Sequence, residues 1–296
     1  MSGTVAVLGP GAVGGALAVR LSLANYHVIC VGPAETIGPI ALAGLSVESR
    51  EGTLSARPEV RERLETPVRL LLVTVKAPAL EEALERVDPA SVEQGVAVSL
   101  LNGLEHMEHL HATFDGRVAA GSVSHYQAYR PGRVQIVETS AAPLVTMASD
   151  TLSASEVERA ADILRSGRIE VRVAPSEKRV LWHKAARISA LAAATAATGR
   201  TVGELRADPE WRDRLQKAIR EACTVAEADG VALRPGSQWA IVEEIADEST
   251  TSAARDVASG RRSELDAILG AVLRAAERHD VPTPILRELA STAGLP

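Results

Sequence analysis

The chain has 296 residues, and its hydrophobic (46%) and charged (24%) fractions are those of soluble globular proteins, which excludes a disordered, collagen-like or coiled-coil protein. The formal net charge of -6 provides no basic surface for nucleic acid or an anionic membrane. Two cysteines far apart in the sequence exclude a disulfide scaffold. The chain does not open with the basic stretch and long apolar run of a signal peptide, so we expect a cytoplasmic protein. Its length is that of about two domains.

The first half of the chain alternates short apolar runs with helical stretches, the first of which covers residues 12–24. Runs that are apolar on both faces are typical of parallel strands covered by helices on both sides. Right-handed crossovers wind such strands into a Rossmann doubly wound parallel sheet. The expected strands cover residues 5–8, 27–31, 70–75, 96–101, 133–137, 143–147 and 168–173.

The second half is helical almost to its end. Aromatic residues make up 2% of the chain, so we expect its core to consist of closely packed, alanine-rich helices. The expected helices cover residues 176–197, 209–228, 238–245, 264–278 and 284–293. The sequence thus predicts an α/β protein with a dinucleotide-binding Rossmann domain, residues 1–174, and an all-helical domain, residues 175–296.

A glycine-rich motif follows the first expected strand and opens the first helix; it reads Gly9-Pro10-Gly11-Ala12-Val13-Gly14. In this context Gly9 permits a tight turn, Gly11 lets the backbone approach a diphosphate, and Gly14 lets helix and strand pack closely. The amides at the helix start, including those of Ala12 and Val13, would bind the phosphates. The alternative is a glycine-rich turn that binds nothing.

The residue at the end of the second strand normally determines the nucleotide preference: an acidic residue there favours NAD, and an arginine favours NADP. Here the chain reads Val31-Gly32-Pro33-Ala34-Glu35, with neither residue type at the usual place. Glu35 either binds a ribose hydroxyl or is solvated, and the sequence leaves both readings open.

Three polar residues are candidates for a substrate or cofactor site. Lys184 lies among apolar residues of the long helix, and desolvation there would lower its pKa toward the range useful for proton transfer. The alternative is that the side chain of Lys184 extends along the edge of the helix into water. Lys76 and Asn102 follow the third and fourth strands, at the carboxyl edge of the sheet. For Asn102 the alternative is a plain Asn-Gly turn.

Taken in order, these residues resemble the ketopantoate reductase (2-dehydropantoate 2-reductase) family over nearly the whole chain. The matching features are the glycine motif, Lys76, Asn102-Gly103, Trp182-x-Lys184, residues 252–256, Gly260-Arg261, residues 263–266 and Pro282-x-Pro284. The resemblance implies a Rossmann domain, a helical domain, an active site in the cleft between them, and hydride transfer from NADPH to a 2-oxo acid.

The resemblance also implies a role for each site residue. Lys184 would be the general acid that protonates the carbonyl oxygen, and Glu264 would hold that lysine or contact the substrate hydroxyl. Ser252 would bind the carboxylate end of the substrate. Asn102 would contact the nicotinamide ribose and the substrate, and Lys76 would lie beside the cofactor.

The chain departs from the family pattern at three positions. Family members carry asparagines one and two helical turns after the lysine, where this chain has Ile188 and Ala192, so we expect a less polar carbonyl substrate than ketopantoate. Ser189 or Thr195 could compensate in part. Pro33 replaces the family's arginine for the adenosine phosphate, so NADP is expected and NAD stays open.

We therefore expect an NAD(P)H-dependent oxidoreductase that reduces a 2-oxo acid or related carbonyl compound; a catalytically silent nucleotide-binding redox sensor is the alternative. The expected partner is this small molecule, with no nucleic acid or membrane, and a homodimer is left open.

Histidines are the remaining candidates for a site. His106, His109 and His111 could place two imidazoles on one helix face, but they lie in an expected surface helix, and we expect no metal. His125 either contacts the substrate or makes a structural hydrogen bond.

Overall fold

The computed structural model describes residues 3–124, 126–140 and 143–295. It divides into two compact units, the first made of residues 1–101 and 106–180 and the second of residues 102–105 and 181–296. The division between Val180 and Leu181 falls inside one continuous helix, α6 (Glu177–Thr198), whereas residue 174 was the expected boundary. A short segment around Asn102 also belongs to the second unit.

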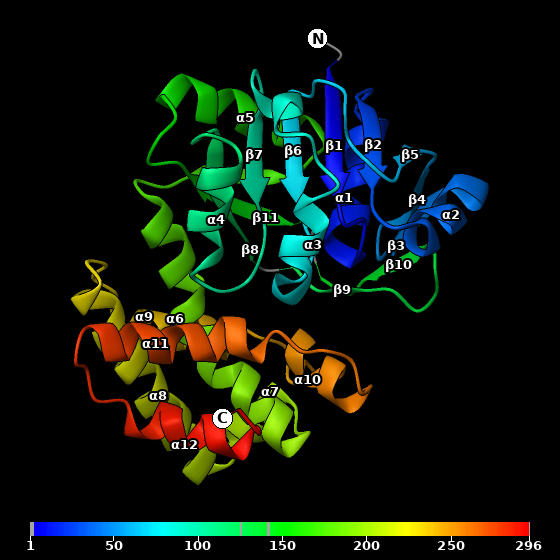
Figure 1. Cartoon of the computed structure of the whole chain (residues 1–296). Helices are drawn as coiled ribbons and strands as arrows, with labels where there is room; N and C mark the ends of the chain where they lie inside the picture. The colour runs from blue at the N-terminus through cyan, green and yellow to red at the C-terminus, as the bar shows by residue number, and fades with distance from the viewer. Residues whose placement is uncertain (1–2, 125, 141–142, 296) are drawn as a thin grey trace. The chain divides into compact units, whose positions relative to one another are not determined.

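An eight-stranded sheet forms the centre of the first unit (Figure 1). Its strands are β1 (Thr4–Leu8), β2 (His27–Val31), β5 (Glu59–Arg61), β6 (Leu70–Val73), β7 (Val96–Ser99), β8 (Val118–Ser124), β11 (Leu144–Ala148) and β12 (Glu170–Val173). Their order is β12-β11-β8-β7-β6-β1-β2-β5. The pair β8–β11 is antiparallel and the other neighbouring pairs of this sheet are parallel, so the expected doubly wound fold is confirmed with a mixed rather than purely parallel sheet.

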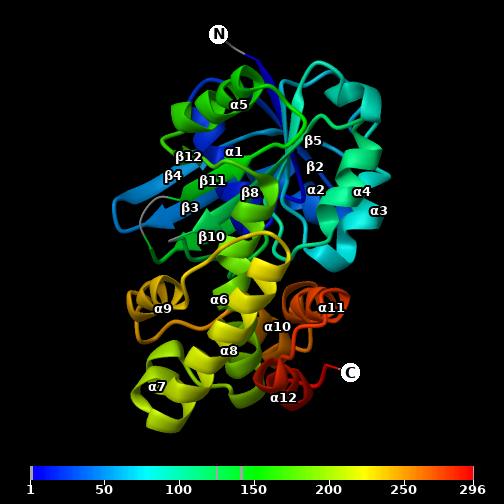
Figure 2. The same ribbon diagram turned by 90° about the vertical axis from the view of Figure 1, so that its left-hand side faces the viewer.

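Helices cover both faces of this sheet. Helices α1 (Ala12–Leu23) and α5 (Ala154–Ser166) lie on one face, and α3 (Leu80–Leu84) and α4 (His106–Thr113) on the other (Figure 2). The first unit also contains α2 (Ala34–Ala43) and two short 3-10 helices, η1 (Ala77–Ala79) and η2 (Pro89–Val92). This double cover explains why β6 and β7 are buried at every position and read as continuous apolar runs.

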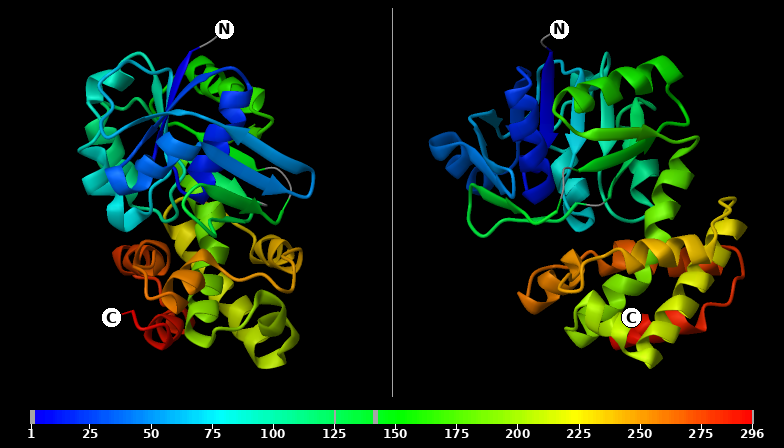
Figure 3. Two further views of the ribbon diagram at one scale, coloured as in Figure 1. Left: turned by 90° about the vertical axis from the view of Figure 1, so that its right-hand side faces the viewer. Right: turned by 180° about the vertical axis from the view of Figure 1, so that it is seen from behind.

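A separate four-stranded sheet packs beside α1 (Figure 3). It contains β3 (Leu45–Ser49), β4 (Gly52–Ala56), β9 (Ala128–Tyr129) and β10 (Gln135–Glu138), in the order β4-β3-β10-β9. The strand expected at residues 133–137 exists, but its place in the main sheet was wrong. β10 packs so closely on α1 that a Cβ on Gly15 would lie 2.7 Å from Cδ1 of Ile136.

The second unit is all-helical, as predicted. Besides the rest of α6 it contains α7 (Val202–Ala207), α8 (Pro209–Ala228), α9 (Pro235–Glu243), α10 (Ser252–Ala258), the π-helical segment η3 (Asp266–Gly270), α11 (Ala271–Arg278) and α12 (Pro284–Thr292). Helix α8 packs against α7, α9, α11 and α12, and the core is rich in alanine. Helices α7 and α10 were not predicted. Within the described residues, no helix has the length and apolar character needed to cross a membrane.

Candidate functional site

Two glycines of the motif are required by the packing of the turn. Gly9 has a φ of +82°, and a Cβ there would lie 2.4 Å from Cγ1 of Val75. A Cβ on Gly14 would lie 2.2 Å from Oγ1 of Thr74 and 2.8 Å from the carbonyl oxygen of Gly9. The Thr74 hydroxyl donates hydrogen bonds to the carbonyl oxygens of Leu8 (3.0 Å) and Gly9 (2.8 Å). Larger residues at Gly9 or Gly14 would therefore disrupt the contact between β1, α1 and the end of β6.

The third glycine faces open space. A Cβ on Gly11 would meet one neighbour within 4 Å, the carbonyl oxygen of Gly9 at 3.9 Å. Gly11 is also the N-cap of α1, where no side chain caps the helix and no acidic residue occupies the first turn. The amides of Ala12 and Val13 lie in this first turn, where helical N–H groups have no intrahelical acceptor. The turn therefore fits the diphosphate of a dinucleotide.

The neighbouring strand ends carry the other expected cofactor contacts. Lys76 is the N-cap of η1 and follows β6, which pairs in parallel with β1, so it lies at the same sheet edge as the glycine turn. At the end of β2, Pro33 is the N-cap of α2 and Glu35 is exposed in the first turn of that helix. Pro33 therefore brings no cation to the end of β2.

One cation near the turn was missed by the sequence analysis. Arg130 follows β9, and its Nη1 donates a hydrogen bond to the carbonyl oxygen of Pro10 (2.8 Å) inside the glycine motif. Its charge also acts on the Cys30 thiol of β2, although burial outweighs it and raises the pKa of that thiol to about 12. Arg130 opens the sequence Arg130-Pro131-Gly132, a pattern that indicates a turn and not a binding site.

The second unit presents Lys184 from α6. The helix is fixed just before it by Trp182, which is 1% exposed and donates from Nε1 to Oδ2 of Asp229 (2.8 Å). Burial, and after it the neighbouring Arg187, lower the pKa of Lys184 from 10.5 to about 8, while the charge of Glu264 acts in the opposite direction. The direction is the one expected from the apolar neighbours, and it brings the ammonium into a range suited to proton donation.

Asn102 and Glu264 are joined in the same unit. Nδ2 of Asn102 donates to Oε2 of Glu264 (3.3 Å), and Glu264 is 5% exposed. Oδ1 of Asn102 is buried and has no hydrogen-bond partner in the described structure, which leaves an acceptor for a ligand. Gly103 has a φ of +104° and comes so close to the backbone of Ala267 that a Cβ would lie 2.4 Å from its carbonyl oxygen. Packing against Ala267 therefore requires glycine at position 103, next to the amide that contacts Glu264.

An ion-pair network holds this segment in place. Arg274 of α11 donates to both carboxylate oxygens of Glu105, with Nη2–Oε2 and Nε–Oε1 distances of 2.7 and 3.0 Å. Its Nη1 donates to Oδ1 of Asp266 (2.8 Å), the first residue of the π-helical segment. Both sides of the Asn102–Glu264 hydrogen bond are thus fixed to one arginine, which the sequence analysis did not single out.

The remaining expected substrate residues lie on α6 and α10. Ser252 is partly exposed at the start of α10, whose N-cap is Thr251. The hydroxyls of Thr251 and Thr195 are hydrogen-bonded (2.7 Å), and Thr195 also donates to the carbonyl oxygen of Leu191 (2.8 Å). Thr195 therefore has a structural role in joining the two helices. Ser189 is fully buried, and its Oγ has no partner in the part of the chain that is described.

Ile188 and Ala192 contribute to an apolar wall. They follow Lys184 at one and two helical turns, so they share its face of α6. This wall also contains Ala253, Leu265 and Ile268. Ala253 and Leu265 are the next residues in the chain after Ser252 and Glu264, so this wall is built from the same segments as the polar residues of the candidate site.

The histidines have other surroundings. His106 is 8% exposed and burial lowers its pKa to about 4, while Nε2 of His111 lies 2.8 Å from Oε2 of Glu177. Among the described residues, no group of three or more His, Cys, Asp or Glu side chains is placed to hold a metal. His125 lies outside the described residues.

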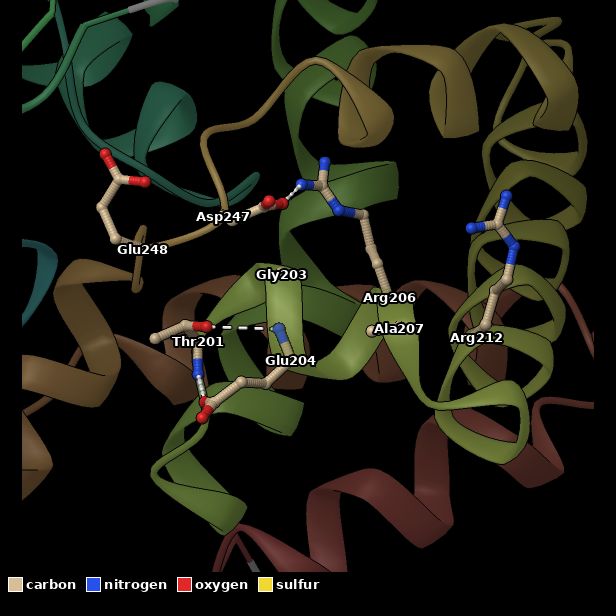
Figure 4. Close-up of a pocket in the computed structure, with 8 residues that line it drawn as sticks. All are labelled: Thr201, Gly203, Glu204, Arg206, Ala207, Arg212, Asp247 and Glu248. Atoms are coloured by element: carbon tan, nitrogen blue, oxygen red, sulfur yellow. Dashed lines mark hydrogen bonds and ion pairs between the residues drawn. The ribbon is translucent and has the colours of Figure 1, made fainter.

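A pocket of about 610 Å³ lies elsewhere in the second unit (Figure 4). It is lined by Thr201, Gly203, Glu204, Arg206, Ala207, Arg212, Asp247 and Glu248, none of which is an expected site residue. Arg206 and Asp247 of this lining form an ion pair, Arg212 pairs with Glu243 outside the pocket, and Glu204 and Thr201 form the capping box of α7.

A dinucleotide turn on a Rossmann sheet, together with a lysine, a carboxylate and an amide in a helical unit, defines the class of NAD(P)-dependent oxidoreductases. Residues 5–148 match the family model of ketopantoate reductase PanE/ApbA, and residues 178–294 match the model of its C-terminal part. The chain belongs to the ketopantoate reductase family, which confirms the resemblance inferred from the sequence.

Individual relatives agree with this assignment. The chain is 27% identical over 285 residues to the uncharacterized oxidoreductase YkpB of Bacillus subtilis, covering 95% of this chain and 94% of YkpB. It is 29% identical over 291 residues to the 2-dehydropantoate 2-reductase of Caulobacter vibrioides, again covering 95% and 94%. A D-mandelate dehydrogenase solved with NADH and anilino(oxo)acetate has the same fold, with a TM-score of 0.90, 20% identity, and coverage of 98% and 97%.

Proposed function

We propose that the protein reduces the carbonyl group of a 2-oxo acid to a hydroxyl group, with NADPH or NADH as the hydride donor and with an apolar substituent on the substrate. The observation that carries the proposal is the hydrogen bond between Asn102 and Glu264, in the same unit as a lysine whose pKa is lowered to about 8. Lowered pKa values together with unpartnered polar atoms are typical of active sites.

The bound nucleotide would supply a hydride to the carbonyl carbon. As negative charge develops on the carbonyl oxygen, the Lys184 ammonium stabilises it and donates the proton. Glu264 favours the charged form of this lysine, so it keeps the proton available. Asn102 donates to Glu264 through Nδ2 and offers its unpartnered Oδ1 to a hydroxyl group of substrate or cofactor.

The substrate class follows from the residues around Lys184, Glu264 and Asn102. Ser252 would donate to the carboxylate of the substrate from the start of α10. The apolar wall replaces two amide side chains of the family pattern at Ile188 and Ala192, so a polar substituent would lose its partners there, whereas an alkyl or aryl group would be favoured. The fold shared with a D-mandelate dehydrogenase solved with anilino(oxo)acetate is consistent with this choice.

Oxidation of NADPH and NADH in the presence of ketopantoate, phenylglyoxylate and 4-methyl-2-oxopentanoate tests the proposal. We expect turnover, with a higher kcat/KM for the two apolar acids than for ketopantoate. Binding of either nucleotide without oxidation by any 2-oxo acid would instead support the redox-sensor alternative.

Two further expectations from the sequence stay predictions: a cytoplasmic location, and a homodimer, which light scattering would detect as twice the chain mass.

A further inference from the structure

We propose that Arg130 binds the 2′-phosphate of NADPH, in place of the cation that Pro33 does not provide, and so makes NADPH the preferred nucleotide. This inference rests on the proposed function, because it names the nucleotide that the same site takes. Three observations support it: Arg130 contacts the glycine turn, the strand before Arg130 is tied to helix α1, and the guanidinium group has a donor without a hydrogen-bond partner within the described residues.

Arg130 lies where the adenosine ribose of a dinucleotide is normally bound. Its Nη1 donates to the carbonyl oxygen of Pro10 (2.8 Å) in the glycine turn. Pro10 in turn lies against Gly32, the first residue after β2: its Cδ is 3.7 Å from the position of a Cβ on Gly32. In Rossmann folds the end of β2 is the place where the ribose 2′ position is recognised.

The backbone that carries Arg130 is fixed to the helix that follows the glycine turn. Tyr129 of β9 pairs with Val137 of β10. The next residue, Glu138, is 4% exposed and accepts hydrogen bonds from Nη2 of Arg20 on α1 (2.8 Å) and from the hydroxyl of Tyr126 (2.6 Å). Because α1 begins at the turn, these contacts tie the strand that precedes Arg130 to the helix that follows the turn.

The guanidinium group is ready for an anion. Nε of Arg130 is buried and has no hydrogen-bond partner within the described structure, and burial lowers the pKa of the group. The titratable group that acts on it is the Cys30 thiol, which stays neutral because burial raises its pKa to about 12. A half-buried cation without a counter-charge is unfavourable, and a phosphate supplies both the negative charge and a pair of oxygens that the planar guanidinium can bind.

The 2′-phosphate fits this position better than the diphosphate does. The diphosphate already has the first-turn amides of α1, on the Gly11 side of the motif. Arg130 instead contacts Pro10, next to the residue that follows β2. NADH, which lacks the 2′-phosphate, would leave the guanidinium unpaired.

The test is fluorescence titration of NADPH and NADH with the full-length protein and three variants. We expect the unaltered protein to bind NADPH at least about tenfold more tightly than NADH. Arg130→Met should weaken NADPH binding about 10- to 100-fold and NADH binding less than about threefold. Arg130→Lys should give an intermediate loss of NADPH affinity, because lysine keeps the charge but lacks the paired N–H donors of a guanidinium group. Arg133→Met, which removes a charge from an exposed position of the same connection, should change neither.

Equal losses for both nucleotides in Arg130→Met, at unchanged melting temperature, would overturn the assignment to the 2′-phosphate, as would unchanged binding of NADPH. If the unaltered protein binds neither nucleotide, the proposed function itself fails, which is a different outcome from a nucleotide-binding protein that is indifferent to Arg130.

Discussion

The pKa of Lys184 predicts a specific pH dependence of the reduction. If the lysine is the general acid, its protonated form is active, and kcat/KM falls as the pH rises through the pKa, which burial and Arg187 lower from 10.5 to about 8. Raising the pH from 8 to 10 should then reduce kcat/KM about fiftyfold, since the protonated fraction falls from about one half to about one hundredth. A lysine with the ordinary pKa would lose less than about a third of its protonated form over the same range.

Glu264→Gln provides the second half of this test. Glu264 raises the pKa of Lys184, so removal of its charge should move the alkaline limb of the profile to lower pH. Glutamine keeps the shape of the side chain and an oxygen that accepts from Asn102. Glu244→Gln, which changes the net charge equally at an exposed position, is the matched control and should leave the limb in place.

The assay is the initial rate of NADPH oxidation at low substrate concentration from pH 6 to 10. A profile that is flat to pH 10, or a limb that Glu264→Gln moves to higher pH, would refute the role assigned to this pair.

The glycine motif and the apolar wall give two further predictions. Gly14→Ala should lower the melting temperature, because its Cβ would lie 2.2 Å from Oγ1 of Thr74. Gly11→Ala, whose Cβ meets open space, should keep the melting temperature and weaken nucleotide binding. The opposite pattern in thermal melts and nucleotide titrations would contradict the diphosphate site. Ile188→Asn, at a partly exposed position, should raise kcat/KM for ketopantoate about tenfold. Ala192→Asn, at a position 1% exposed, should lower the free energy of unfolding by about 1–3 kcal/mol. An unchanged ranking of 2-oxo acids in Ile188→Asn would remove that residue from the substrate site.

Local patterns predicted the elements whose burial is uniform. Helix α8 covers residues 209–228 as expected, because Asp208 caps it and Pro209 opens it, and β1 and β2 are buried at nearly every position. Strand β8 was missed because its residues, such as Gly121, are small; a Cβ on Gly121 would lie 2.8 Å from the carbonyl oxygen of Ser99 in β7, so the neighbouring strand, and not strand propensity, makes it a strand.

Contacts across long sequence separations could not be derived in the same way. Asn102 and Glu264 are 162 residues apart, and Arg130 and Pro10 are 120 residues apart. The first pair was expected to share a site through the family resemblance, which names both residues. No such pattern points to Arg130, so its contact with the glycine turn became visible only in the structure.

The rate of hydride transfer in a single turnover of Lys184→Ala tests directly whether this lysine is the general acid; the loss of NADPH absorbance with an apolar 2-oxo acid reports that rate. We expect a rate at least about a hundredfold below that of the unaltered protein, with the Kd for NADPH unchanged. The control variant Lys217→Ala, which removes an exposed lysine of the helical unit, should leave the rate unchanged. Hydride transfer at an undiminished rate in Lys184→Ala would contradict this role of the lysine.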